Sequence, residues 1–145
     1  MKLSNILSIL EEMAPLGYAE DFDNVGLLVG NPNQEIDGVL VCHDALESVI
    51  DEAISKKCNL VVCFHPILFS GIKKITGKNY VERAILKAIK NDIAIYAVHL
   101  IQIKTIIHIQ LGKKLTRFLR CNRSISCSKF HKNFCFFRKN KTIRI

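Results

Sequence analysis

The sequence predicts an α/β domain, with a parallel βαβ-type sheet and flanking helices. Short apolar runs rich in β-branched residues occur over 38–42, 60–64 and 93–98, as expected for strands buried on both faces. Amphipathic helical patterns lie between these runs, which gives the order β-α-β-α-β. Strands that are linked through helices in this way form a parallel sheet with right-handed crossovers.

The first element is an amphipathic helix that ends near Pro15. An apolar run over 25–30 follows, and the polar residues 31–33 predict a turn. Asp21, Asp23 and Asn24 precede the apolar run, where turn and cap chemistry is favoured and a ligand role is the alternative. The apolar side of the helix consists of Leu3, Ile6, Leu7 and Leu10.

Two further helices connect the strands. Asp44 and Glu47 are placed to cap the first of them, and Asn79 and Glu82 form a capping box for the second. Both show apolar residues at i, i+3, i+4, i+7 and i+8, the pattern of one buried face. These are Leu46, Val49, Ile50, Ala53 and Ile54 in the first, and Val81, Ala84, Ile85, Ala88 and Ile89 in the second.

Histidines follow the strands of this unit. Pro66 stops the run over 60–64, so His65 is expected at the carboxyl end of a buried strand, where open α/β sheets place their ligands. A lone histidine at a strand end is more often structural than a ligand. His43 and His99 also follow predicted strands, however, and three histidines at the strand ends of one sheet favour a metal site.

The loop over 71–79 resembles a phosphate-binding loop only superficially. The spacing between Gly71 and Gly77 is one residue too long, and Asn79 stands where a serine or threonine would hold magnesium. A nucleotide-binding loop is therefore not expected here. The lysines of this loop could still face an anionic substrate.

The composition predicts a single cytoplasmic domain. No stretch of the 145 residues is long and apolar enough to span a membrane, and Glu11 and Glu12 argue against a signal peptide. The six cysteines show no CxxC spacing, which favours reduced thiols over a disulfide framework.

The charge divides the chain just after His99. Residues 1–99 hold 9 basic and all 13 acidic residues, whereas residues 100–145 hold 12 basic residues and no acid. We therefore expect a mildly acidic α/β domain over 1–99 and a basic, poorly packed segment over 100–145. The latter shows one modest helical pattern, around Leu111, Leu115 and Leu119.

Residues 1–99 closely resemble the amino-terminal part of the Nif-three-like dinuclear metal family, also named GTP cyclohydrolase 1 type 2 homologues. The resemblance is carried by Asp23-Asn24-Val25-Gly26-Leu27, by Cys63-Phe64-His65-Pro66-Ile67-Leu68-Phe69, and by Thr76-Gly77-Lys78-Asn79-Tyr80 leading to Tyr96-Ala97-Val98-His99. It implies the amino-terminal half of that fold, a homo-oligomer, and a site for two divalent metal ions in a metal-dependent hydrolase.

Most of the ligands that the resemblance implies are missing. His65 matches the second histidine of an adjacent pair, but Phe64 occupies the place of the first. Ile103 lies where a metal-binding aspartate is expected after His99, and the distal histidine and glutamate belong to a part that this chain lacks. His65 is thus the one metal ligand expected, with weak or absent binding of zinc or manganese.

Two interpretations of residues 100–145 remain open. The segment could be the out-of-frame product of an A/T-rich gene, the interpretation favoured by the loss of family motifs at the same boundary. It could instead be a basic tail with interleaved aromatics, able to bind polyanions non-specifically. The sequence therefore predicts a truncated family member that has largely lost its activity. The alternative is a non-enzymatic scaffold or nucleic-acid-binding protein.

Overall fold

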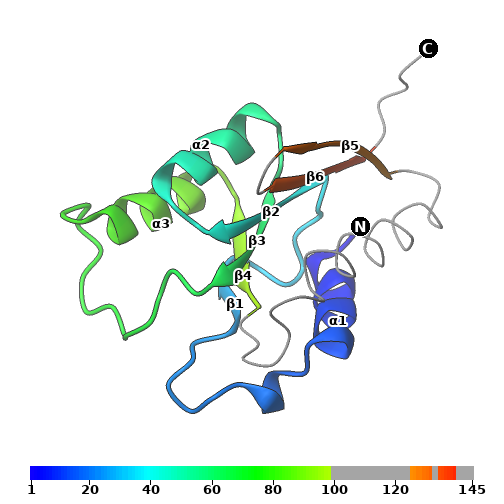
Figure 1. The fold of residues 1–145 in the computed structure, drawn as a ribbon. Coiled ribbons are helices and arrows are strands. Elements are labelled where there is room, and N and C mark those ends of the chain that lie inside the picture. Colours follow the sequence, from blue (N-terminus) through cyan, green and yellow to red (C-terminus); the bar gives the residue numbers. More distant parts are fainter. Residues whose placement is uncertain (99–124, 132–133, 140–145) are drawn as a thin grey trace.

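The computed structural model describes residues 1–98, 125–131 and 134–139, and for the last two stretches it gives the course of the backbone. Helices flank a sheet whose strands come from both ends of the chain (Figure 1). The elements in chain order are α1 (Leu3–Met13), the 3₁₀ turn η1 (Leu16–Tyr18), β1 (Gly26–Val29), β2 (Gly38–Asp44), α2 (Glu47–Ser55), β3 (Leu60–His65), α3 (Tyr80–Lys90), β4 (Ala94–Ala97), β5 (Ile125–His131) and β6 (Phe134–Lys139).

The sheet has the strand order β1-β4-β3-β2-β6-β5. Its centre confirms the predicted parallel unit, because β2 pairs in parallel with β3 and β3 in parallel with β4. The outer strands make the sheet mixed: β1 is antiparallel to β4, β6 to β2, and β5 to β6. The fold class is therefore confirmed, and its parallel part is limited to the three strands that helices connect.

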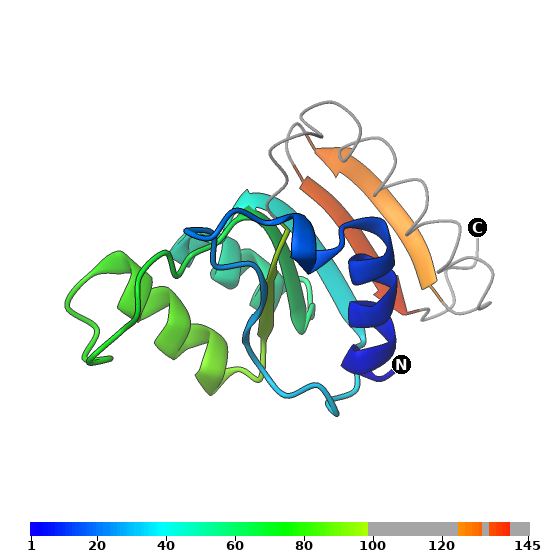
Figure 2. The same ribbon diagram turned by 90° about the horizontal axis from the view of Figure 1, so that it is seen from below.

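Two apolar layers cover the two faces of this sheet. On one face, α1 packs with its buried leucines and isoleucine on alternate residues of β2, β3 and β4. On the other face, α2 and α3 pack on the residues in between (Figure 2). This double coverage explains why the central strands are continuous apolar runs. The strand residues of the α2–α3 layer include Leu40, Cys42, Val61, Cys63 and Ile95.

The buried faces of α2 and α3 are narrower than the sequence patterns predicted. Leu46 and Ile54 are 46% and 38% exposed, and Ile89 of α3 is 53% exposed. A helix on a sheet buries a stripe of limited width, so apolar residues at the margins of that stripe remain in contact with water. The residues that do pack inward are Val49, Ile50 and Ala53 of α2, and Ala84, Ile85 and Ala88 of α3.

One of the two predicted caps is confirmed and the other is wrong. The Asn79 side chain accepts a hydrogen bond of 2.8 Å from the Glu82 amide, which is the N-cap half of a capping box, and the Glu82 carboxylate accepts at 2.9 Å from the Asn79 side-chain amide. At α2 the capping position is Leu46, and Asp44 instead belongs to the end of β2. Glu47 pairs with basic residues of α3. The hydrogen bonds that it accepts, first of all the one from Arg83, lower the pKa of its carboxyl.

Glu82 also occupies the loop that resembles a phosphate cradle. Its Oε2 accepts hydrogen bonds from the Thr76 amide at 2.8 Å, the Thr76 hydroxyl at 2.9 Å and the Lys78 amide at 3.0 Å. Backbone amides that bind a carboxylate of the chain are not available to a phosphate. This supports the exclusion of a nucleotide-binding loop. No helix within the described residues is long and apolar enough to cross a membrane.

Candidate metal centre

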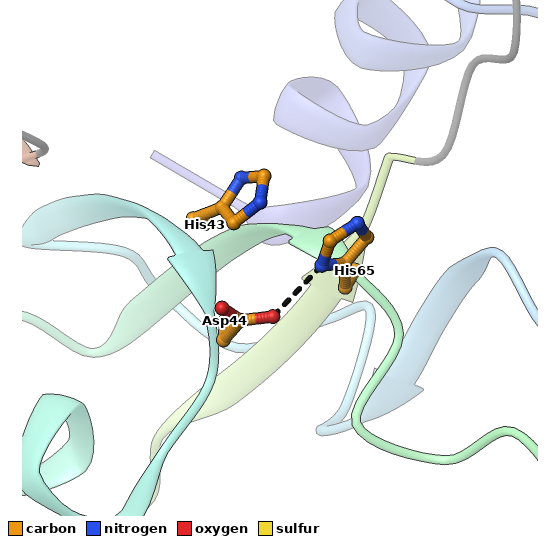
Figure 3. A group of neighbouring side chains, drawn as sticks. All are labelled: His43, Asp44 and His65. Atoms are coloured by element: carbon orange, nitrogen blue, oxygen red, sulfur yellow. Dashed lines mark hydrogen bonds and ion pairs between the residues drawn. The ribbon is translucent and has the colours of Figure 1, made fainter.

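The candidate site lies where β2 and β3 end side by side. These strands are parallel, and their register places Cys42 beside Cys63 and Asp44 beside His65. The last residues of both strands therefore meet at the carboxyl edge of the sheet, where ligand sites of α/β proteins form. His43, Asp44 and His65 gather there, as Figure 3 shows.

The geometry of this cluster is compact. Nδ1 of His65 and Oδ1 of Asp44 are 2.8 Å apart, within hydrogen-bond distance. The ring centroids of His43 and His65 are 4.3 Å apart, with the planes inclined by 61°. Each of the three residues offers a ligand atom, and these atoms all lie within 4.8 Å of one another. The cluster thus presents two imidazoles and one carboxylate to a common space.

The cluster is open to solvent. The side chains of His65 and Asp44 are 37% and 49% exposed, and His43 is exposed as well. Ions and small molecules can therefore reach the ligand atoms directly. The exposure also means that the contact between His65 and Asp44 adds little to folding stability.

Phe64 takes part in the packing of the site and offers no ligand atom. Its ring stacks on His43 with a centroid distance of 5.3 Å and an interplanar angle of 7°. It also meets the edge of His65, with centroids 5.0 Å apart. Phe64, which stands where the family resemblance implies a histidine, thus packs against both imidazoles.

The other candidates from the sequence lie elsewhere. Asn24 donates a hydrogen bond of 2.7 Å from its Nδ2 to the carbonyl of Leu68, so it ties two loops together. Asp21 and Asp23 are not members of the His43–Asp44–His65 cluster, the one group of potential metal ligands found among the described residues. His99 and Ile103 lie outside the residues that the structure describes, so their predicted roles stay predictions.

Three cysteines lie in the core of residues 1–98. Cys42, Cys58 and Cys63 are free thiols and are buried. Burial raises the pKa of the Cys63 thiol to about 12, and it also raises the pKa of Cys42. Neutral buried thiols are poor nucleophiles and poor metal ligands. The prediction of reduced thiols is consistent with these three residues.

Sequence reasoning missed the role of Asp44. Its spacing to Glu47 suggested a helix cap, whereas its carboxylate turns to His65 on the neighbouring strand. The signal that could have revealed this is the register of the two strands, because aligning Cys42 with Cys63 places Asp44 next to His65. The sequence favoured His65 alone as a ligand, and the structure adds two further side chains with ligand atoms.

The fold and the cluster define an α/β domain with a potential metal site at the carboxyl edge of its parallel strands. Residues 1–101 match the family model of Duf34/NIF3 (NGG1p interacting factor 3), and the chain belongs to this family. The match ends two residues beyond the boundary expected at His99.

Several known proteins are similar over the same region. A "GTP cyclohydrolase 1 type 2 homolog" of Clostridium acetobutylicum is 41% identical over 99 residues, which are 68% of this chain and 37% of that protein. The Bacillus subtilis protein of the same name is 43% identical over 94 residues, 65% of this chain and 25% of the relative. A solved structure from Staphylococcus aureus aligns with a TM-score of 0.66 and 36% identity, covering 68% of this chain and 32% of the other. The chain therefore spans about a quarter to just over a third of the length of these relatives.

Proposed function

We propose that this protein is a divalent-metal-binding member of its family, with a reduced site around His65 and little or no hydrolytic activity. The observation that carries the proposal is the contact of 2.8 Å between His65 Nδ1 and Asp44 Oδ1. Histidines that ligate metals commonly donate their other ring N–H to a carboxylate, which fixes the tautomer and the ring orientation. A His65 that donates Nδ1–H to Asp44 would bind a cation through Nε2.

The residues present do not fit a centre for two metal ions. Phe64 and Ile103 stand at positions where the family resemblance implies ligands, and neither side chain has a donor atom. Two imidazoles, one of them oriented by a carboxylate, offer nitrogen ligands that suit one borderline cation such as Zn²⁺. In enzymes, an ion of this kind acts as a Lewis acid on water or a polar substrate group. In this chain His65 would bind the ion and Asp44 would orient His65.

The test is zinc binding by the full chain, measured in competition with a chromophoric chelator. We expect weak binding of one Zn²⁺, and an affinity at least about tenfold lower for His65→Ala. His131→Ala removes a histidine of β5 instead and serves as the matched control. Equal affinities of the wild type and His65→Ala would refute the proposal. Nucleotide and phosphoester hydrolysis should stay at the level of the uncatalysed reaction with zinc or manganese present.

A second candidate function is polyanion binding through residues 100–145. The segment carries 12 basic residues and no acid, which favours non-specific binding to nucleic acid. Affinity for single-stranded DNA should then fall steeply, by about a thousandfold between 50 and 200 mM salt. Binding that is insensitive to salt, or unchanged by Lys113→Glu combined with Lys114→Glu, would exclude this function.

A further inference from the structure

We infer that His43 supplies a second nitrogen ligand, so that His43 and His65 together bind one borderline divalent cation beside Asp44. This inference rests on the proposed function and extends it to a residue for which the family resemblance implies no role. Its basis is the juxtaposition of the two imidazoles, whose centroids are 4.3 Å apart, with the carboxylate next to them. Phe64 on β3 has no donor atom, whereas His43 on the neighbouring strand β2 places an imidazole nitrogen next to His65.

The distances are close to those of a real site. Ligand atoms about 2.05 Å from a tetrahedral Zn²⁺ are about 3.3 Å from one another. One ligand atom from each of His43, Asp44 and His65 lies within 4.8 Å of the other two, so a gap of that width between the two imidazole nitrogens would have to close by about 1.5 Å. All three side chains are at least partly exposed at strand ends, where changes in side-chain torsion angles can close it.

The donor types decide which cation is preferred. Imidazole nitrogens favour Cu²⁺, Ni²⁺ and Zn²⁺, whereas Mg²⁺ and Mn²⁺ favour sites dominated by oxygen. With two nitrogens and one carboxylate in reach, the site should bind Zn²⁺ more tightly than Mn²⁺. A site of one nitrogen with carboxylates from elsewhere would discriminate less between the two ions.

Packing is the competing explanation for His43, because its ring stacks on Phe64 at 5.3 Å. The variant His43→Phe separates the two roles: it retains an aromatic ring for stacking and removes the nitrogen ligand. His43→Ala removes both. A stacking role alone predicts a loss of stability in His43→Ala and unchanged zinc affinity in His43→Phe.

The experiment measures Zn²⁺ and Mn²⁺ affinity by chelator competition in the full chain, with circular dichroism confirming that each variant folds. We expect His43→Phe to lower zinc affinity at least about tenfold and to reduce the preference for zinc over manganese. Phe64→His in the His43→Phe background should restore the affinity, because position 64 lies 5.0 Å from the His65 ring and returns a nitrogen to the same space.

Three results would overturn the inference, and the first of them separates it from the proposed function. If His65→Ala abolishes zinc binding but His43→Phe keeps wild-type affinity, His43 is a packing residue and the proposed function stands. If neither substitution changes zinc affinity, the cluster does not bind the ion, and both proposals fail. Unrestored affinity in the double variant would likewise overturn the shared site.

Discussion

Replacing Asp44 by asparagine should weaken metal binding far more than it weakens the fold. The carboxylate holds Nδ1 of His65 at 2.8 Å, and the amide in Asp44→Asn would keep the size of the side chain without its charge. Carboxylates that orient a ligand histidine contribute about 10- to 100-fold to metal affinity, which corresponds to about 1.4 to 2.7 kcal/mol. We therefore expect zinc affinity to fall by that factor.

The effect on stability should be much smaller. The two side chains are 37% and 49% exposed, so their contact is screened by water and contributes less than about 1 kcal/mol to the free energy of unfolding. Chelator competition measures the affinity, and urea unfolding measures the stability. Asp37→Asn, just before the opposite end of β2, is the matched control and should change neither quantity. If Asp44→Asn costs more than about 2 kcal/mol of stability and leaves zinc affinity unchanged, Asp44 is a structural residue and the reasoning is refuted.

Three further predictions concern the fold that supports the site. Gly30→Ala should lower the free energy of unfolding in urea by at least about 2 kcal/mol, because Gly30 has φ +124° and a Cβ there would lie 2.6 Å from a side chain of β4. The control Gly71→Ala, where the added Cβ meets open space, should leave the stability unchanged. Ile50→Ala should cost about 2–5 kcal/mol and Ile54→Ala under about 1 kcal/mol, since Ile50 is fully buried and Ile54 is 38% exposed; equal costs would contradict the orientation of α2. Backbone amides of the 76–78 loop lower the pKa of the Glu82 carboxyl below its ordinary value of 4.5. The ionised carboxylate therefore stabilises the loop fully above pH 4.5, and this stabilisation is lost as the pH falls through the lowered pKa. Amide exchange in the loop should speed up at low pH in the wild type and show no such step in Glu82→Gln.

The central unit of the fold could be predicted because its signals are local. The apolar runs over 60–64 and 93–98 and the capping box at Asn79 depend on residues close in sequence, and all are confirmed. The direction of β1 could not be predicted in the same way. The two strands that flank each other here, β1 and β4, are separated along the chain by β2, α2, β3 and α3, and their antiparallel pairing joins Gly26 to Ala97. Such a pairing is fixed by tertiary packing.

The candidate site was predictable in part for a related reason. A strand followed by Pro66 indicates that His65 stands at a strand end, and the end of the apolar run over 38–42 places His43 near the end of β2. Whether two strand ends meet depends on strand order and register, and neither can be predicted from the local sequence pattern of one segment. Asp44 shows the consequence: its local pattern suggested a cap, and the register with His65 decided otherwise.

The most direct test of the account is the number of zinc ions bound per chain, measured by equilibrium dialysis of the full protein followed by elemental analysis. The donors that the described residues bring together fit one ion at the His43–Asp44–His65 cluster, so we expect one Zn²⁺ there, bound weakly and released by His65→Ala. Two tightly bound ions per chain, or one that survives His65→Ala, would contradict the account.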